Sequence, residues 1–346
     1  ANNDNESLSL LLSSLFGPLC RDNAENALRN AISLDATCHE ADLILEQITG
    51  LASKDTVHAR KPKEFVAELF DSFADTFDEK LTKTLDYRVP KIIGTTVRDL
   101  FVDENNKAKK NKNNHVVFRY VLDAGCGTGL AGRELRNAID NVGNNNNNNN
   151  NGERITLVGV DASTKMLEIA EQCTTTQGCG LPISSTTATT DERLNNELRL
   201  YDALLDLDLE EMTLENTLML TNTETDSGFD LIVAADVFVY FGSLERILQV
   251  FSSLHNDKNN DSSARGGVLV FTCEVATTEE APLGYRLLPT GRFAHTKEHA
   301  VQAASFVGYS LSSYKQIVPR TEKGAAVDGH LFVFQYTGGK QDEGEL

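Results

Sequence analysis

The stretch YVLDAGCGTGLAG, residues 120–132, decides the fold. An apolar run reaches Asp123 and is followed at once by Gly125, Gly127 and Gly129, after which a helical pattern begins. Glycine lets the backbone turn sharply and approach a ligand closely, because it has no Cβ. A helix after such a turn offers unpaired N–H groups and the positive end of its dipole. The stretch therefore predicts a strand, a ligand-binding turn and a helix.

From residue 116 onward, short β-rich runs alternate with helical patterns. We predict strands within 116–125, 153–163, 201–209, 229–241 and 266–274, helices at 130–139, 165–172, 244–254 and 297–306, and a final strand pair at 309–318 and 330–338. Such alternation is typical of a doubly wound sheet, and two successive strands at the end give an antiparallel edge. The expected fold class is α/β, with a mostly parallel seven-stranded sheet, an antiparallel edge and additional N-terminal helices.

The chain before this sheet divides by composition. We predict an N-terminal helical segment at 1–50, a polar linker at 51–63, the α/β domain at 64–337 and a disordered tail at 338–346. Residues 26–50 resemble the junction between two tetratricopeptide (TPR) repeats, although an ordinary helical hairpin fits equally well. A phenylalanine-rich amphipathic helix at 64–81 either covers the ligand cleft as a lid or packs on the core. A second helix is expected to start near Pro90.

Charge and cysteine usage limit the partners. The 346 residues include 32 Lys and Arg against 51 Asp and Glu, a net charge of −19, which opposes binding to a nucleic-acid backbone or an anionic membrane. No apolar run is long enough to span a membrane. The six cysteines include no CxxC pair, and Cys173 and Cys179 have no neighbouring histidines, so we expect free thiols and no metal site. We expect a cytoplasmic protein, with an organellar location left open.

Four low-complexity segments interrupt the α/β pattern, at 103–114, 144–151, 173–196 and 255–267. Each follows a predicted helix and precedes a predicted strand. Ligands of parallel sheets bind at the carboxyl ends of the strands. We therefore predict that all four segments lie at the opposite edge, away from the ligand.

The glycine spacing distinguishes among nucleotide-binding motifs. A dinucleotide fingerprint would read G-x-G-x-x-G, and a P-loop would end in Gly-Lys-Ser/Thr. The form D-x-G-x-G-x-G, from Asp123 to Gly129, instead resembles motif I of class I S-adenosylmethionine (SAM)-dependent methyltransferases. The resemblance extends over about residues 64–337. It implies SAM as cofactor, with Asp123, Gly125, Gly127 and Gly129 in the binding turn.

Acidic residues follow the next predicted strands. Asp161 ends the second strand, where a carboxylate can accept hydrogen bonds from ribose hydroxyls. The resemblance implies further ligand contacts from the segments that follow. Met166 would flank the ligand, Asp208 (or Asp206) would bind the adenine amino group, and Leu209 would pack on the ring. Asp236, near the end of the fourth strand, would face the methyl donor.

A narrower resemblance concerns predicted methyltransferases that carry TPR repeats before the catalytic domain. Residues 284–299, GYRLLPTGRFAHTKEH, are similar to that subgroup and place Arg286, Arg292 and His295 in a loop after the fifth strand, together with Tyr285. Arginine binds carboxylates and phosphates through two hydrogen bonds, which suits an anionic acceptor. His295 or Tyr240 would serve as base for an amine or hydroxyl acceptor. Arg292 would orient a carboxylate acceptor, or alternatively would form a structural ion pair.

The resulting hypothesis is a SAM-dependent methyltransferase that acts on a small anionic acceptor. Its catalytic candidates are His295, Tyr240 and Arg292. One rival is a non-catalytic SAM-binding or TPR-type scaffold protein that binds a partner through its N-terminal helices. A nicotinamide-dependent dehydrogenase is a second rival, which the glycine spacing disfavours.

Overall fold

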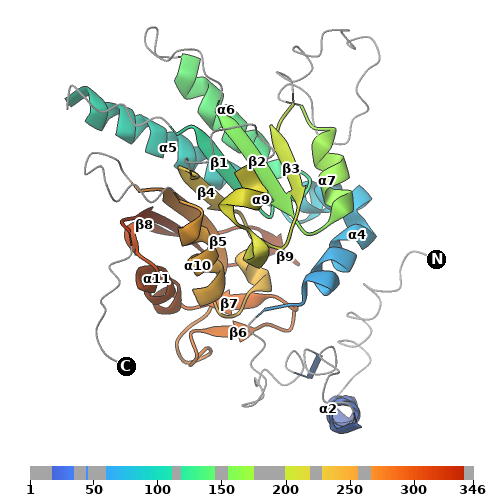
Figure 1. The fold of residues 1–346 in the computed structure, drawn as a ribbon. Helices are drawn as coiled ribbons and strands as arrows, with labels where there is room; N and C mark the ends of the chain where they lie inside the picture. The colour runs from blue at the N-terminus through green and yellow to red at the C-terminus, as the bar shows by residue number, and fades with distance from the viewer. Residues whose placement is uncertain are drawn as a thin grey trace.

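A mostly parallel sheet forms the centre of the protein (Figure 1). The structure, a computed structural model, describes residues 18–34, 44–45, 60–110, 118–144, 155–174, 199–218, 228–255 and 266–338. Seven strands follow one another across the sheet in the order β3-β2-β1-β4-β5-β11-β8. Their bounds are β1 Tyr120–Ala124, β2 Thr156–Asp161, β3 Ala203–Asp206, β4 Leu231–Ala234, β5 Val268–Val275, β8 Tyr309–Ile317 and β11 Gly329–Tyr336. The predicted fold class is confirmed.

Strand direction also agrees with the prediction. The first five strands pair in parallel, whereas β11 runs antiparallel to both β5 and β8. The strand order reverses at β1, which has β2 as its neighbour on one side and β4 on the other. In open α/β sheets, such a reversal leaves a crevice beyond the carboxyl ends of the strands.

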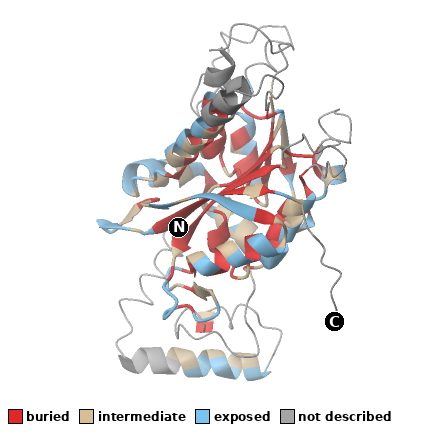
Figure 2. Cartoon of the chain, turned by 90° about the vertical axis from the view of Figure 1, so that its left-hand side faces the viewer, coloured by how far each residue is buried: buried red, intermediate tan, exposed pale blue. Residues whose placement is uncertain are grey.

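Helices bury both faces of the sheet (Figures 1 and 2). Successive β1 residues point to opposite sides, so Val121 belongs to one core cluster and Leu122 to the other. The cluster around Val121 includes side chains of α5 Val89–Lys110, α6 Leu130–Asn144 and α7 Thr164–Glu171. The cluster around Leu122 includes side chains of α10 Glu245–Ser253 and α11 Lys297–Phe306. Burial on both faces explains why these strands read as continuous apolar runs.

The segment after β5 differs from the prediction. It was expected to be a loop, but it forms a hairpin of β6 Tyr285–Leu287 and β7 Phe293–His295, and β7 pairs in parallel with the end of β5. A second short hairpin, β9 Thr321–Glu322 with β10 Ala325–Ala326, lies between β8 and β11. Runs of two or three residues are too short to produce a clear period in the sequence.

The fourth strand is shorter than predicted. β4 ends at Ala234, and a 3-10 turn, η4 Phe238–Tyr240, follows it. The chain leaves the strand because Asp236 adopts a left-handed backbone conformation, with φ of 59°. Its N–H donates to Thr272 Oγ1 at 2.9 Å, which fixes this turn against β5. Non-glycine residues in this conformation are uncommon and concentrate at functional sites.

The predicted lid helix is present as α4 Lys63–Glu79, followed by a single π-helical turn at Lys80–Thr84. Of the predicted linker, residues 60–63 are described, and they pack against the α/β domain: Lys61 N–H donates to the Tyr240 carbonyl at 2.9 Å. The described end of the predicted linker thus contacts the α/β domain, and the boundary at residue 64 stays a prediction.

Most of the N-terminal segment falls outside the described residues. The described residues of this segment are α2 Pro18–Leu34 and two helical residues at 44–45, so the TPR-like hairpin stays a prediction. Within the described ranges, no helix has the length and apolarity to cross a membrane. Cys126 and Cys273 are free thiols, but Cys173 is disulfide-bonded, so the expectation of free thiols is wrong for Cys173.

The low-complexity segments lie mostly outside the described residues, so their position relative to the ligand stays a prediction. The helix α5 continues through residues 103–110, which were predicted to interrupt the pattern. In the chain, the undescribed stretches 111–117, 145–154, 175–198 and 256–265 precede β1, β2, β3 and β5. One described residue of the third segment, Cys173, reaches the turn after β1: its Sγ lies 3.2 Å from the Thr128 carbonyl oxygen.

Candidate functional site

A cavity opens at the carboxyl ends of the parallel strands, where the switch in strand order places it. Eight of the residues predicted for the site line it: Gly125, Gly127, Asp161, Asp208, Leu209, Asp236, Tyr240 and Arg292. They come from the ends of four successive parallel strands and from the turn before β7. The topology therefore brings together residues that lie far apart in the sequence.

The glycine turn is built around left-handed backbone conformations. Gly125, Gly127 and Gly129 have φ values of 72°, 53° and 91°. The N–H groups of Gly125 and Cys126 donate to the Val160 carbonyl at 2.8 and 2.9 Å, which ties the turn to the end of β2. A Cβ at Gly127 would have only Phe77 Cε1 near it, at 3.9 Å, so the missing side chain leaves space on the cavity side.

Asp161 lies at the end of β2 and connects the strand ends. Its Oδ2 accepts from the Gly127 N–H at 2.8 Å, and its Oδ1 accepts from the Ser163 N–H at 2.9 Å. Burial raises the pKa of Asp161, and these two backbone donors oppose the shift. The carboxylate is therefore held at the cavity wall beside the glycine turn.

Asp208 also reaches the cavity, but it is already paired. Its two oxygens accept from Arg60 Nη1 and Nη2 at 2.8 and 2.7 Å, and Arg60 also contacts Glu210. Burial tends to raise the pKa of Asp208, but the Arg60 guanidinium outweighs it and the pKa is lowered. A ligand amino group at Asp208 would have to share this carboxylate with Arg60.

The helix α4 covers one side of the cavity. Val66, Phe70 and Phe77 on this helix contribute to the lining, and the Phe70 ring meets the Tyr240 ring edge-on at 5.4 Å. Two acidic residues on α4 fasten it: Asp71 accepts from the Ser163 hydroxyl, and Asp78 accepts from the Thr128 hydroxyl. The predicted lid position is thus confirmed for Phe70 and Phe77.

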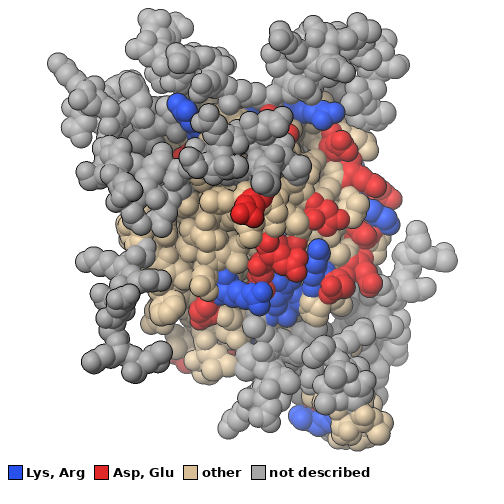
Figure 3. Space-filling view, in the orientation of Figure 1, with Lys and Arg blue, Asp and Glu red and all other residues tan. Residues whose placement is uncertain are grey.

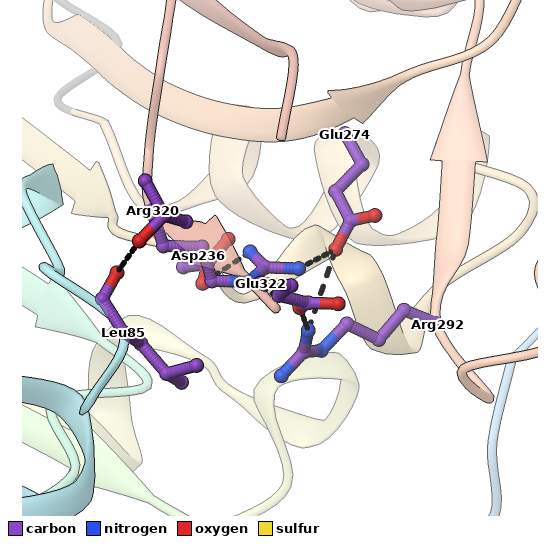
Figure 4. Close-up of polar contacts among 7 residues, drawn as sticks. Leu85, Asp236, Glu274, Arg292, Arg320 and Glu322 are labelled. Carbon is purple, nitrogen blue, oxygen red and sulfur yellow. Dashed lines mark hydrogen bonds and ion pairs between the residues drawn. The ribbon is translucent and has the colours of Figure 1, made fainter. Parts of the chain in front are cut away.

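The far wall of the cavity carries an ion cluster that includes Asp236 and Arg292 (Figure 4). Arg292 Nη1 lies 2.6 Å from Glu322 and 3.8 Å from Glu274. The buried Arg320 contacts Glu274, donates to Glu322 at 2.7 Å and lies 3.5 Å from Asp236. The cluster joins the strand ends of β4 and β5 to the two short hairpins.

The two tyrosines on this wall are Tyr87 and Tyr240. Burial raises the pKa of Tyr240 to about 12, and burial together with the Asp236 carboxylate raises that of Tyr87. Both hydroxyls therefore stay protonated near neutral pH. Tyr240 lines the cavity as predicted, but such a phenol is unsuited to act as a base.

The predicted base His295 does not reach the cavity. Its side chain is fully buried in β7, and its Nε2 lies 2.8 Å from the Phe241 carbonyl and 3.0 Å from that of Gly242. Burial, together with nearby His299, lowers the pKa of His295 to about 3. The prediction of a catalytic role is wrong, because pairing of β7 with β5 turns this side chain into the interior.

The predicted arginine pair is also separated. Arg286 and Tyr285 lie on β6 and are absent from the cavity lining, and Arg286 lies 3.5 Å from Glu280. Only Arg292 faces the cavity, and its contact with Glu322 agrees with the alternative of an ion pair. The two guanidinium groups therefore do not form the single cationic cluster that the sequence predicts.

Three further cofactor candidates lie behind the cavity wall. Met166 and Asp123 are fully buried, and Gly129 packs near Leu200 and Tyr201. Asp206, the alternative to Asp208, is likewise outside the lining and accepts from the Thr164 hydroxyl. None of these residues is part of the cavity lining, so the prediction of direct contact is corrected for each of them.

The buried position of Asp123 can be tested. Its Oδ2 accepts from the Tyr201 hydroxyl at 2.7 Å, its Oδ1 has no described partner, and burial raises its pKa to about 7. The folded state then binds more protons than the unfolded state between pH 4 and 7, so stability falls as pH rises through this range. Relative to Asp123→Asn, the native chain should lose roughly 2–3 kcal/mol in free energy of unfolding from pH 5 to pH 8. Urea unfolding of both proteins measures it; parallel pH profiles would contradict the raised pKa.

Several residues of the site carry no sequence signal. Arg60 and Lys61 stand in a polar stretch that reads as linker, and Tyr87 and Arg320 stand in short irregular segments. Their roles depend on chain segments that meet only in the folded protein. A basic pair followed by Pro62 at the start of α4 is too common a pattern to indicate a site.

Charges on the surrounding surface are mixed. On the face seen in Figure 3, the main group of Lys and Arg side chains lies against Asp and Glu side chains. The contacts of Arg60 and Arg246 with Glu210 are examples. Within the part of the chain that the structure describes, no three His, Cys, Asp or Glu side chains are grouped so as to hold a metal ion.

No family model and no curated protein sequence matches the chain. Solved structures match it along most of its length. The magnesium protoporphyrin IX methyltransferase of Synechocystis PCC 6803, with bound SAH, is 15% identical with a TM-score of 0.45, over 80% of this chain and 99% of that chain. The (4+2)-cyclase SpnF is 13% identical with a TM-score of 0.49, over 81% and 98%. The 1,6-didemethyltoxoflavin-N1-methyltransferase of Burkholderia thailandensis is 11% identical with a TM-score of 0.44, over 80% and 91%. One fold hosts many activities, so these likenesses do not define the reaction.

Proposed function

We propose that this chain binds SAM in the cavity and transfers its methyl group to a small acceptor. One observation carries the proposal: Gly127, Asp161, Leu209 and Asp236, from the ends of successive strands, line a single cavity. These are among the positions that the resemblance to class I SAM-dependent methyltransferases assigns to SAM. A dinucleotide fingerprint would require a different glycine spacing, which disfavours a dehydrogenase.

The residues present fit such a ligand in three respects. The space beside Gly127 lets a ligand approach the backbone, and a Cβ there would fill it. Asp161 offers a carboxylate at the end of β2, where ribose hydroxyls bind in related sheets. Leu209 lines the cavity next to Asp208 and offers an apolar surface for a flat ring.

Bound SAM would supply a methyl group that is already activated by a positively charged sulfur. The chain then has to align the acceptor with that group and exclude water, which are effects of positioning and desolvation. The helix α4 and its phenylalanines cover the cavity and serve the second purpose. The wall of Asp236, Tyr240 and Arg292 is where we place the acceptor.

The proposal is tested in two stages. Isothermal titration with SAM and SAH tests binding, and absence of heat at high protein concentration would contradict the assignment of the cavity. Incubation with labelled SAM and small-molecule or protein fractions of a cell extract tests transfer. Binding without transfer to any fraction would favour the non-catalytic alternative.

We propose further that an anionic group of the acceptor contacts Arg292 by displacing Glu322. The support is that Arg292 lines the cavity with its guanidinium at the acceptor wall. Arg292→Ala should raise the acceptor KM about tenfold or more, the scale of a lost charge-assisted hydrogen bond, with SAM affinity nearly unchanged. Kinetics on the labelled fraction measure the acceptor KM, and isothermal titration with SAM measures the SAM affinity. An unchanged KM would leave Arg292 with a structural role only.

A further inference from the structure

Lys61 is a lysine buried in the wall of the cavity. Its side chain is only 4% exposed, and the residue belongs to the cavity lining. It lies two residues before the start of α4 Lys63–Glu79. Its backbone N–H donates to the Tyr240 carbonyl at 2.9 Å, which fixes Lys61 next to the proposed acceptor wall.

The ε-amine of Lys61 lacks the carboxylate partner that buried lysines usually have. Its one described contact is the Phe65 ring, whose centroid lies 4.8 Å from Nζ. The two nearby arginines both have carboxylate partners in the structure: Arg60 contacts Asp208 and Glu210, and Arg292 contacts Glu322. Within the described residues, Lys61 is thus a buried amine at the cavity with no counter-charge.

We propose that the ε-amine of Lys61 is the base that takes a proton from the methyl acceptor. This inference rests on the proposed function. The acceptor atom gains the methyl group and loses its own proton to Nζ, which becomes an ammonium and later releases the proton to solvent. The acceptor is therefore a hydroxyl, phenol or amine, because a carboxylate has no proton to lose.

The surroundings of Lys61 support the neutral form of its amine. Burial, assisted by the Arg292 guanidinium, lowers its pKa to about 8. Several charged and titratable groups surround it. Arg60 and Lys63 lie on its own segment, and Asp208 and Glu210 lie beside Arg60. Asp236, Tyr240 and Arg292 belong to the adjoining acceptor wall. The other candidate bases are less suited: His295 is sealed off, and the Tyr240 phenol titrates far above neutral pH.

The first measurement needs neither SAM nor an acceptor. Acetic anhydride acetylates only neutral amines, so the acetylation rate of Lys61 across pH 6–11, followed by peptide mass spectrometry, gives its pKa. The midpoint does not depend on how accessible the amine is. Lys297, whose Nζ lies 4.1 Å from the Tyr314 ring, is a matched control with a similar ring contact. We expect a midpoint near 8 for Lys61; a midpoint above about 10, in the ordinary range of lysine, would overturn the proposal.

The second measurement distinguishes whether Lys61 accepts a proton or only supplies a positive charge. The rate of label transfer from SAM into the extract fraction should fall at least 100-fold in both Lys61→Met and Lys61→Arg, because arginine keeps the charge but cannot accept a proton. Lys297→Met should leave that rate unchanged, and native activity should rise with pH and level off above about 8. Activity retained in Lys61→Arg would make Lys61 an anion-binding residue and overturn the base role.

Titration with SAH distinguishes failure of this inference from failure of the proposed function. Both Lys61 variants should bind SAH as the native chain does, which also shows that they are folded. If the native chain itself binds no SAH, the proposed function fails, while the acetylation midpoint still decides whether Lys61 can act as a base. If only the variants lose SAH, Lys61 belongs to the donor site and the inference is wrong.

Discussion

Replacing Gly127 by leucine should abolish binding of SAM and SAH, with an affinity loss above 100-fold. The Gly127 N–H is held by Asp161 at 2.8 Å, and the position where a Cβ would stand faces the cavity. A leucine side chain would occupy the space that the ligand needs. Isothermal titration of SAH into the native and variant proteins measures the effect, and undiminished affinity would show that this turn does not hold the ligand.

Gly127→Ala is the matched control. Both variants force an L-residue into a backbone with φ of 53°, which costs about 1–2 kcal/mol in either case. The alanine Cβ would meet only Phe77 Cε1 at 3.9 Å, an ordinary contact. We therefore expect similar free energies of unfolding for the two variants but much weaker binding for leucine alone. Equal losses in both would mean that backbone strain, and not filling of the cavity, is responsible.

The sequence predicts the ends of β1 and β2 well, because each depends on local signals. Apolar runs with glycine or aspartate directly after them determine where β1 and β2 end, and parallel pairing then brings Gly127 and Asp161 together. The same reasoning predicts the position of α4 from the spacing of its phenylalanines. Residues that follow a strand directly are thus placed correctly.

The sequence does not predict the orientation of side chains in the short hairpins. His295 and Arg292 are three residues apart in one predicted loop, but the pairing of β7 with β5 buries His295 and leaves Arg292 at the cavity. A shift of one residue in such a strand would exchange its two faces. Arg60 and Lys61 were missed for a different reason: their partners, Asp208 and Tyr240, are distant in the sequence.

The ion cluster at the cavity wall explains why Arg320 matters although it does not line the cavity. The Arg320 side chain is 1% exposed, and it contacts the carboxylates of Glu274, Glu322 and Asp236. Burial raises the pKa of Glu274, and Arg320 is the main group that opposes the shift. The guanidinium therefore favours the charged form of a buried carboxylate, and it contacts Glu322, which also contacts Arg292 at the acceptor wall.

Arg320→Met should lower the free energy of unfolding by about 3–5 kcal/mol at pH 7, because it leaves buried carboxylates with Arg292 as their remaining described cation. Urea unfolding measures the loss. At lower pH the carboxylates take up protons, so the deficit relative to the native chain should shrink toward pH 5. The double variant Arg320→Met/Glu274→Gln should recover part of the loss.

Arg88→Met is the matched control: Arg88 contacts Asp86 at the surface, and its loss should change the free energy of unfolding by less than about 0.5 kcal/mol. A deficit that is independent of pH, or equal in Arg88→Met, would show that Arg320 stabilises the wall by packing and not by charge.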